Sequence, residues 1–371
     1  MIDYVEIRDF NTRKIISIVD NFKSLIWAVE YFGVGSFEIY APASAQNLKN
    51  LKENLIVTRP NDKNVGIIDK IEVQNSITDG NVIIASGHFA KILLNRRIIY
   101  VKAGTYSIAP TILNGRVANA AVKLVNENCV SSALTHRNFN AFRCANVTPD
   151  LDAVILDGDG QPSKIQVTYD NLLTYTDELL KKYGYAARVE LDESGNFVYF
   201  IFQGTDRSQT LTFSREYDNL GNTNYTYDTQ NLKTTAIVGG QGEGLERFIA
   251  MAGNDVTGYS RRELWVDDNQ AAKTIKDEET EEETTLTDAE YNKMLATDGL
   301  IKLSECKTIE NFEGEIDLTG GRLVYGVDYN LGDLIKIFDS TINKTAICRI
   351  IKINEVQDEN GYNIAAEYET V

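Results

Sequence analysis

The chain has 371 residues, a hydrophobic content of 43% and a formal net charge of -17 at pH 7. This length allows about two to four domains with sizeable apolar cores. It contains no run of about 18 apolar residues, which excludes a membrane-spanning helix. The negative charge argues against sequence-independent nucleic-acid binding, because such binding depends on Lys and Arg.

The termini and the rare residue types exclude further classes. Acidic Asp3 and Glu6 occur where a secretory signal would carry Lys or Arg, so we expect a first strand there. With only two histidines, we expect neither a His-based metal site nor a His-containing catalytic triad. The cysteines are widely spaced, and we expect them to be reduced and buried: Cys129, Cys144, Cys306 and Cys348.

Residues 1–100 are predicted to form an N-terminal β-barrel tube domain. Short apolar strands recur at intervals of about 8–12 residues, which is typical of a meander or a closed barrel. One strand over 24–31 is followed by a turn at Gly33 and Gly35 and a second strand over 36–41. A hairpin turn is predicted at Pro60-Asn61-Asp62, between strands at 55–58 and 65–68.

Residues 101–165 are predicted to form a small helical and loop-rich domain. Apolar residues at helical spacing indicate a helix over 116–129, with Asn114 as its N-cap. The sequence from Asp157 to Gly160 resembles the start of a calcium loop. The residues that follow it supply neither a third ligand nor a bidentate Glu, so a polar turn is favoured.

Residues 166–268 are predicted to form an α+β second tube-like domain. Its helix should begin after Thr168 and end at Gly184. Five apolar runs should form one sheet, at 187–191, 197–202, 231–238, 248–252 and 261–266.

Four glycines follow a β-branched strand, at Gly239, Gly240, Gly242 and Gly244. The Lys of a phosphate-binding loop is missing after them, and their spacing is not that of a dinucleotide-binding fingerprint. Because glycine permits positive φ and close backbone approach, we expect a tight structural joint here rather than a ligand loop.

Residues 269–304 are predicted to be an acidic mobile excursion with a short helix. Six of the seven residues at 277–283 are acidic, and such a run repels itself. Thr287 and Glu290 form a capping box for a helix expected to end at Gly299. Residues 305–371 are predicted to form a C-terminal β-barrel-like domain with a hairpin at Asn360-Gly361. The chain is thus expected to be α+β, β-rich and multi-domain.

Four segments resemble one family when they are taken in order: residues 18–27, 35–42, 238–244 and 260–267. The chain is similar to the N-terminal hub region of tail-associated lysin proteins of phages with long non-contractile tails. That region is itself similar to the baseplate hub of contractile tails. The motif residues that carry the resemblance are Trp27, Phe37, Pro42, Arg261, Arg262 and Glu263.

This resemblance implies a non-enzymatic structural protein of the virion, without a cofactor, assembled in the host cytoplasm. Two tube-like β domains per chain would allow a homotrimer to form a pseudo-sixfold ring. The trimer would join the sixfold tail tube to the threefold tip and line the channel through which DNA leaves. Implied neighbours are the distal tail ring protein, the tail tube, the tape-measure protein and receptor-binding or spike components. DNA would pass in transit without being bound, since the acidic chain repels phosphate.

Two alternatives remain open from the sequence. The first is a tail-associated cell-wall hydrolase or esterase, because the 54 carboxylates include many conceivable acid pairs. The second is a carbohydrate-binding tail accessory protein, although the 19 tyrosines do not recur at the regular positions of a sugar-binding platform.

Overall fold

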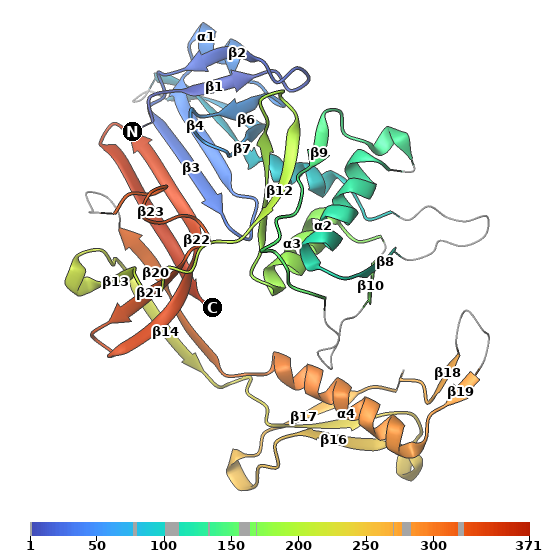
Figure 1. Cartoon of the computed structure of the whole chain (residues 1–371). Coiled ribbons are helices and arrows are strands. Elements are labelled where there is room, and N and C mark those ends of the chain that lie inside the picture. The colour runs from blue at the N-terminus through green and yellow to red at the C-terminus, as the bar shows by residue number, and fades with distance from the viewer. Residues whose placement is uncertain are drawn as a thin grey trace. The chain divides into compact units, whose positions relative to one another are not determined.

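The computed structural model describes residues 2–76, 80–100, 111–132, 134–155, 164–167, 169–269, 271–276, 283–317 and 323–371 (Figure 1). The chain divides into two compact units. Unit 1 comprises residues 1–155, 163–224 and 312–371, and unit 2 comprises residues 156–162 and 225–311. Three predicted features lie outside the described residues: the calcium-like sequence at 157–160, the cap at Thr168, and the acidic run except for Glu283.

The predicted α+β, β-rich class is confirmed. The largest sheet is mainly antiparallel, and its strands pair in the order β14-β20-β23-β22-β3-β4-β7-β6-β5-β1-β2. β21 also pairs with β22, and β13 pairs with β21. The chain passes between the two units within β14 and β20. The strands are β1 (Val5–Arg8), β2 (Ile15–Val19), β3 (Ser24–Glu30), β4 (Ser36–Pro42), β5 (Ile56–Thr58), β6 (Gly66–Ser76), β7 (Gly80–Phe89), β13 (Thr212–Ser214), β14 (Thr223–Asp228), β20 (Ile309–Asp317), β21 (Leu334–Asp339), β22 (Lys344–Asp358) and β23 (Gly361–Thr370).

The end of the chain completes the sheet that its beginning starts. Residues Lys352–Asp358 of β22 pair antiparallel with Ser24–Glu30 of β3, and Figure 1 shows the two strands side by side. The predicted hairpin at Asn360-Gly361 is confirmed, because it joins β22 to β23 and Gly361 has a φ of 118°. The first and last predicted domains therefore share one sheet, and the domain boundaries at 100, 165, 268 and 304 remain predictions.

Alternating apolar residues of these strands form one core of unit 1. Trp27 and Phe37 are cross-strand partners in β3 and β4, with ring centroids 5.7 Å apart. Both side chains are at most 2% exposed, and Phe89 packs on them with its ring 4.9 Å from Trp27. Burying such large rings is worth about 1.5–3 kcal/mol each, so this cluster is a major source of stability.

A second core of unit 1 lies between helices and a small mixed sheet in the order β11-β12-β9. The predicted hairpin at 187–202 is confirmed as β11 and β12. The elements of this region are η1 (Ala90–Arg96), β8 (Thr111–Asn114), α2 (Val117–Val125), η2 (Asn126–Val130), η3 (Thr135–Arg137), β9 (Phe142–Cys144), β10 (Lys164–Val167), α3 (Leu172–Lys182), β11 (Ala186–Leu191) and β12 (Phe197–Phe202). Two short helices complete unit 1: α1 (Ala45–Asn50) and η4 (Arg215–Tyr217).

The caps of the two main helices differ from the prediction. Asn114 belongs to β8 and cannot cap α2, which begins after Arg116 without a side-chain cap. α3 is capped by Asn171, whose side chain accepts hydrogen bonds from the backbone of Leu173 and Thr174. Gly184 follows the end of α3 with a φ of 72°, which confirms the predicted C-terminal signal.

Unit 2 consists of a three-stranded sheet in the order β16-β15-β17 with α4 packed against β15 and β16. Its elements are β15 (Thr235–Gly239), η5 (Gly244–Glu246), β16 (Ile249–Gly253), η6 (Gly258–Ser260), β17 (Glu263–Asp267), β18 (Thr274–Lys276), β19 (Glu283–Thr285) and α4 (Asp288–Glu305). The expectation that the strands at 187–202 and 231–266 form one sheet is wrong, because the latter form their own sheet under α4.

The capping box of Thr287 and Glu290 is confirmed, but the helix is longer than predicted. Gly299 does not end α4. It is buried, and a Cβ there would lie 2.7 Å from Val238 Cγ2 and 3.1 Å from Ala252 Cβ. Glycine at this position permits the close approach of the helix to the sheet, which is a different use of glycine from a helix terminator.

Candidate functional site

Unit 1 contains a cavity of about 900 Å³ that is rich in charged side chains. Such concave sites with convergent polar groups are where ligands and substrates commonly bind, so its chemistry decides between an enzyme and a structural protein. The charged and phenolic residues that line it include Arg59, Asp62, Arg188, Tyr325, Asp333 and Glu355.

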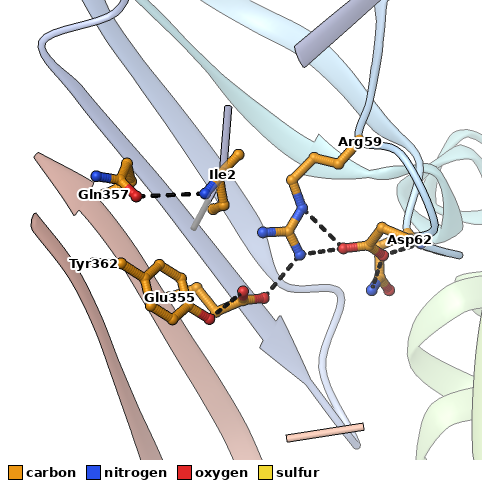
Figure 2. A network of polar contacts seen from close by, with 7 residues as sticks. Ile2, Arg59, Asp62, Glu355, Gln357 and Tyr362 are labelled. Atoms are coloured by element: carbon orange, nitrogen blue, oxygen red, sulfur yellow. Dashed lines mark hydrogen bonds and ion pairs between the residues drawn. The ribbon is translucent and has the colours of Figure 1, made fainter. Parts of the chain in front are cut away.

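Arg59 is the centre of a polar network in this cavity (Figure 2). Its Nε donates to Asp62 Oδ2 at 2.9 Å, and its second terminal nitrogen bonds both Asp62 and Glu355, the latter at 2.7 Å. Tyr362 Oη donates to the other carboxylate oxygen of Glu355 at 2.7 Å. The three charged side chains are only 8–11% exposed. The Arg59 guanidinium also lies over the Trp27 ring, 4.5 Å from its centroid.

Sequence position explains how these groups meet. Arg59 directly follows β5 and precedes the turn at Pro60, whereas Glu355 lies in β22. The pairing of β22 with β3 brings a residue 296 positions away to the end of β5. Nearby, Ile2 N donates to Gln357 Oε1 at 3.4 Å, so the first residues are also held to β22 (Figure 2).

The electrostatics of the network favour its ion pairs. Burial alone would lower the pKa of Arg59, but Asp62 and Glu355 raise it above the ordinary arginine value. The pKa of Tyr362 is raised by burial and by the hydrogen bond to Glu355. The pKa of Tyr325 is raised by burial and by the charges of Asp62 and Glu355. Both phenols are therefore neutral hydrogen-bond donors near pH 7.

A second cluster holds the loop around residue 204 at the cavity. Asp333 is 1% exposed and accepts hydrogen bonds from Arg207 Nε at 2.7 Å and Thr205 N at 2.8 Å. Tyr31 Oη donates to Gly184 O at 2.9 Å and accepts from Gly204 N at 3.2 Å. The Asp333 bonds tie the segment after β12 to the turn before β21, and the Tyr31 bonds tie it to the end of β3 and to the turn after α3.

The arrangement holds strands together through paired charges. A general acid and base need carboxyl groups in contrasting environments with one free to exchange protons. Here Asp62 and Glu355 share one guanidinium, and Asp333 is bonded to another. Within the described ranges, no group of three or more His, Cys, Asp or Glu side chains is placed to hold a metal ion. No helix among the described residues is long and apolar enough to cross a bilayer.

The motif residues singled out in the sequence do not converge on one site. In unit 1, Trp27 and Phe37 belong to the core and Pro42 ends β4. In unit 2, Arg261 forms a partly exposed ion pair with Glu263 at 2.6 Å. Arg262 bonds the carbonyl of Thr229, and its own carbonyl accepts from Thr234 N at 2.8 Å. Each residue has a structural contact.

The four glycines lie where β15 ends and the chain turns towards β16. A Cβ at Gly239 would lie 2.5 Å from the Trp265 ring, and one at Gly240 would lie 2.6 Å from Leu295 Cδ1. Gly242 and Gly244 have φ values of 101° and 56°. A role for these glycines as a joint between domains or subunits remains a prediction.

Neither Arg59 nor Glu355 is among the residues predicted from the sequence to be functional. An arginine between a buried strand and Pro60, and a glutamate inside the apolar strand 346–356, were detectable signals of buried charge. Of the four cysteines, which are all free thiols, Cys129 and Cys348 are buried as predicted, whereas Cys144 and Cys306 are only partly buried.

Unit 2 also presents an exposed apolar surface. Alternation in β16 and β17 directs Ile249, Met251 and Trp265 away from α4, and they are 46%, 64% and 52% exposed. On the turns, Leu245 and Tyr259 are fully exposed. A cluster of large exposed apolar side chains is uncommon on a protein that acts alone and is typical of an interaction surface.

Comparison with known proteins places this architecture in a family. The sequence profile of Siphovirus ReqiPepy6 Gp37-like proteins matches residues 4–367. No curated protein sequence matches the chain significantly.

Three solved structures share the fold over almost the whole chain. The 43 kDa tail protein of prophage MuSo2 from Shewanella oneidensis has a TM-score of 0.56 and 13% identity, over 98% of this chain and 98% of that one. The tail protein from Neisseria meningitidis has a TM-score of 0.52 and 14% identity, over 99% of this chain and 96% of that one. The prophage tail protein gp18 from Listeria monocytogenes has a TM-score of 0.52 and 13% identity, over 98% of this chain and 94% of that one.

Proposed function

This chain belongs to the family of Siphovirus ReqiPepy6 Gp37-like proteins, and we propose that it acts as a structural hub at the tip of a phage tail. The recognition of a phage tail protein from sequence is confirmed by this membership and by the shared fold. The observation that carries the proposal is the extent of that fold. It covers 98% of the chain and 98% of a prophage tail protein.

The cavity of unit 1 supports a non-enzymatic role. Its carboxylates Asp62 and Glu355 are paired with Arg59, and Asp333 is paired with Arg207. Burial and nearby carboxylates raise the pKa of Tyr325, so this phenol is neutral near pH 7. Buried ion pairs of this kind contribute to a defined arrangement of the strands more than to net stability. We therefore assign the Arg59 network the task of fixing the C-terminal strand β22 against the N-terminal sheet.

The proposal extends to assembly. Three copies would form a ring that joins the sixfold tail tube to a threefold tip, with two tube-like β domains from each chain. The exposed apolar surface of unit 2, formed by Ile249, Met251 and Trp265, supports a chain that functions in contact with other proteins. The proposed neighbours are the distal tail ring, the tail tube, the tape-measure protein and the receptor-binding or spike parts.

The charge of -17 supports a passive relation to DNA. A channel wall with excess negative charge repels phosphate, so DNA in transit would pass without being held. In this proposal the protein resides in the virion after assembly in the host cytoplasm.

Labelling of intact particles tests this proposal. Antibodies against the purified chain, visualised by electron microscopy with gold, should bind the distal end of the tail. Labelling along the tail tube or at the head would contradict the hub assignment. A zymogram on bacterial cell walls tests the enzymatic alternative, and clearing by the purified chain would overturn the structural proposal.

A further inference from the structure

A cluster of cationic side chains surrounds a cavity of about 370 Å³ in unit 1, apart from the Arg59 network. The cavity lies where η1 ends and where η3 begins the segment that leads to β9. Its lining residues are Asn95, Arg96, Arg97, Ile98, His136 and Arg137. Three arginines at one small cavity are unexpected in a chain whose acidic residues exceed its basic ones by 17.

The guanidinium groups are held in place by neutral partners. Arg97 Nε donates to Arg137 O at 2.9 Å, and Arg97 also lies over the Phe139 ring at 4.0 Å. Arg137 donates to Ile98 O at 2.5 Å and to Asn128 Oδ1 at 3.1 Å. Asn128 is buried and donates to Leu124 O at 2.9 Å, so the side chain that accepts from Arg137 is itself held in place. Carbonyl and aromatic partners orient the two arginines but leave their charge uncompensated.

Among the described residues, no carboxylate forms an ion pair with these arginines. Within the described ranges, Arg96, Arg97 and Arg137 form no ion pair, whereas three other cations of unit 1 do: Arg59, Lys91 and Arg207. The pKa of Arg137 is lowered by its partial burial and by the positive charge of Arg97, which means that the two guanidiniums repel each other. Arg96 is exposed at the same cavity. A bound anion would relieve this repulsion.

We propose that this cavity binds a single phosphate group through Arg96, Arg97 and Arg137. The planar guanidinium presents paired N–H donors that match the oxygens of phosphate, which lysine does not do as well. The cavity of about 370 Å³ has room for one phosphate group with bound water. A duplex would also meet the negative charge of the surrounding chain, while a small anion experiences mainly the local cluster, since screening at physiological salt acts over about 8 Å.

Equilibrium binding of inorganic phosphate to the full-length chain, measured by titration calorimetry at constant ionic strength, tests the proposal. We expect saturable binding of one phosphate per chain with a dissociation constant on the order of 1 mM. Arg96→Gln should weaken binding about threefold, because Arg96 is exposed. Arg97→Gln should weaken it about tenfold or more, because Arg97 is oriented by its other contacts.

Arg143→Gln is the matched control, since it removes the same charge from an exposed arginine that is paired with Asp192. It should leave phosphate binding unchanged. Arg96 is exposed, and its side chain makes no hydrogen bond with the residues that the structure describes. Arg96→Gln therefore gives a valid result even if Arg97→Gln fails to fold. Equal affinities of Arg96→Gln and Arg143→Gln, or no saturation up to about 50 mM phosphate, would overturn the proposal.

Two further ligands identify the source of the phosphate. Binding of sn-glycerol 3-phosphate at least as tight as that of inorganic phosphate, and lost in Arg96→Gln, would support a phosphate ester as the natural ligand. Tighter binding of a short DNA duplex that also depends on Arg96 would contradict the assignment of a single small anion.

Discussion

Replacing the central cation of the buried network is the perturbation with the largest expected effect. Arg59→Met keeps much of the side-chain length over Trp27 but leaves Asp62 and Glu355 buried without a positive partner. Removing one member of a buried ion pair costs about 3–5 kcal/mol, because the remaining charges stay desolvated. Because all three side chains have low exposure, we expect the loss of unfolding free energy to be that of a buried ion pair and not the smaller loss of a surface pair.

Urea unfolding followed by tryptophan fluorescence measures this effect. The chain has two tryptophans, and Trp27 lies in unit 1 against Arg59 while Trp265 lies in unit 2. In a Trp265→Phe background, the signal therefore reports unit 1 alone. Arg143→Met is the control, because Arg143 lies in unit 1 and its pair with Asp192, whose side chains are 54% and 20% exposed, should contribute at most about 1 kcal/mol.

Removing the two carboxylates as well separates the effect of unpaired charge from the effect of lost packing. Adding Asp62→Asn and Glu355→Gln to Arg59→Met should recover at least about half of the lost stability, since no charge is then left unpaired. A loss no larger than that of Arg143→Met would refute the structural role of the network.

Two further predictions concern unit 2. Gly299→Ala should destabilise unit 2 by about 1–3 kcal/mol despite the higher helix propensity of Ala, because its Cβ would press on Val238 and Ala252. In thermal unfolding, the exposed helix variant Asn292→Ala should be neutral or slightly stabilising, and a gain for Gly299→Ala would contradict the packing described here. The pKa of Asp298 is raised by partial burial and by the neighbouring carboxyl of Asp268, so its contribution to stability is present at low pH and is lost as the pH rises through the folded-state value. Asp298→Asn should therefore raise the stability of unit 2 near pH 7 by a few tenths of a kcal/mol and have no such effect near pH 3. The control is Asp255→Asn at an exposed position, which should not stabilise unit 2 near pH 7.

The sequence predicted local structure better than long-range pairing. The hairpins at Pro60-Asn61-Asp62 and Asn360-Gly361 are encoded by a few adjacent residues, and both are present. The pairing of β22 with β3 joins residues more than 300 positions apart, and no local pattern specifies it. The Arg59 network depends on that pairing. The sequence could therefore indicate that Arg59 and Glu355 are buried charges, but it could not predict that they contact each other.

Helix boundaries show the same limit. The capping box at Thr287 and Glu290 is a local signal and was predicted correctly. The end of α4 was predicted wrongly, because a glycine in a helix has two meanings. From the sequence, Gly299 is interpreted as a helix terminator. In the structure it lies inside α4, where the absence of a side chain lets the helix pack closely against the sheet of unit 2.

The central claim is that this chain acts as part of a ring, and its mass in native buffer tests that claim most directly. Native mass spectrometry should give a species of three copies of the 41.5 kDa chain, about 125 kDa. Met251→Asp with Trp265→Asp, which place charges on the exposed apolar surface of unit 2, measure the contribution of that surface to the assembly. A wild-type chain that stays at 41.5 kDa at high concentration, with no ring in negative-stain images, would contradict the account.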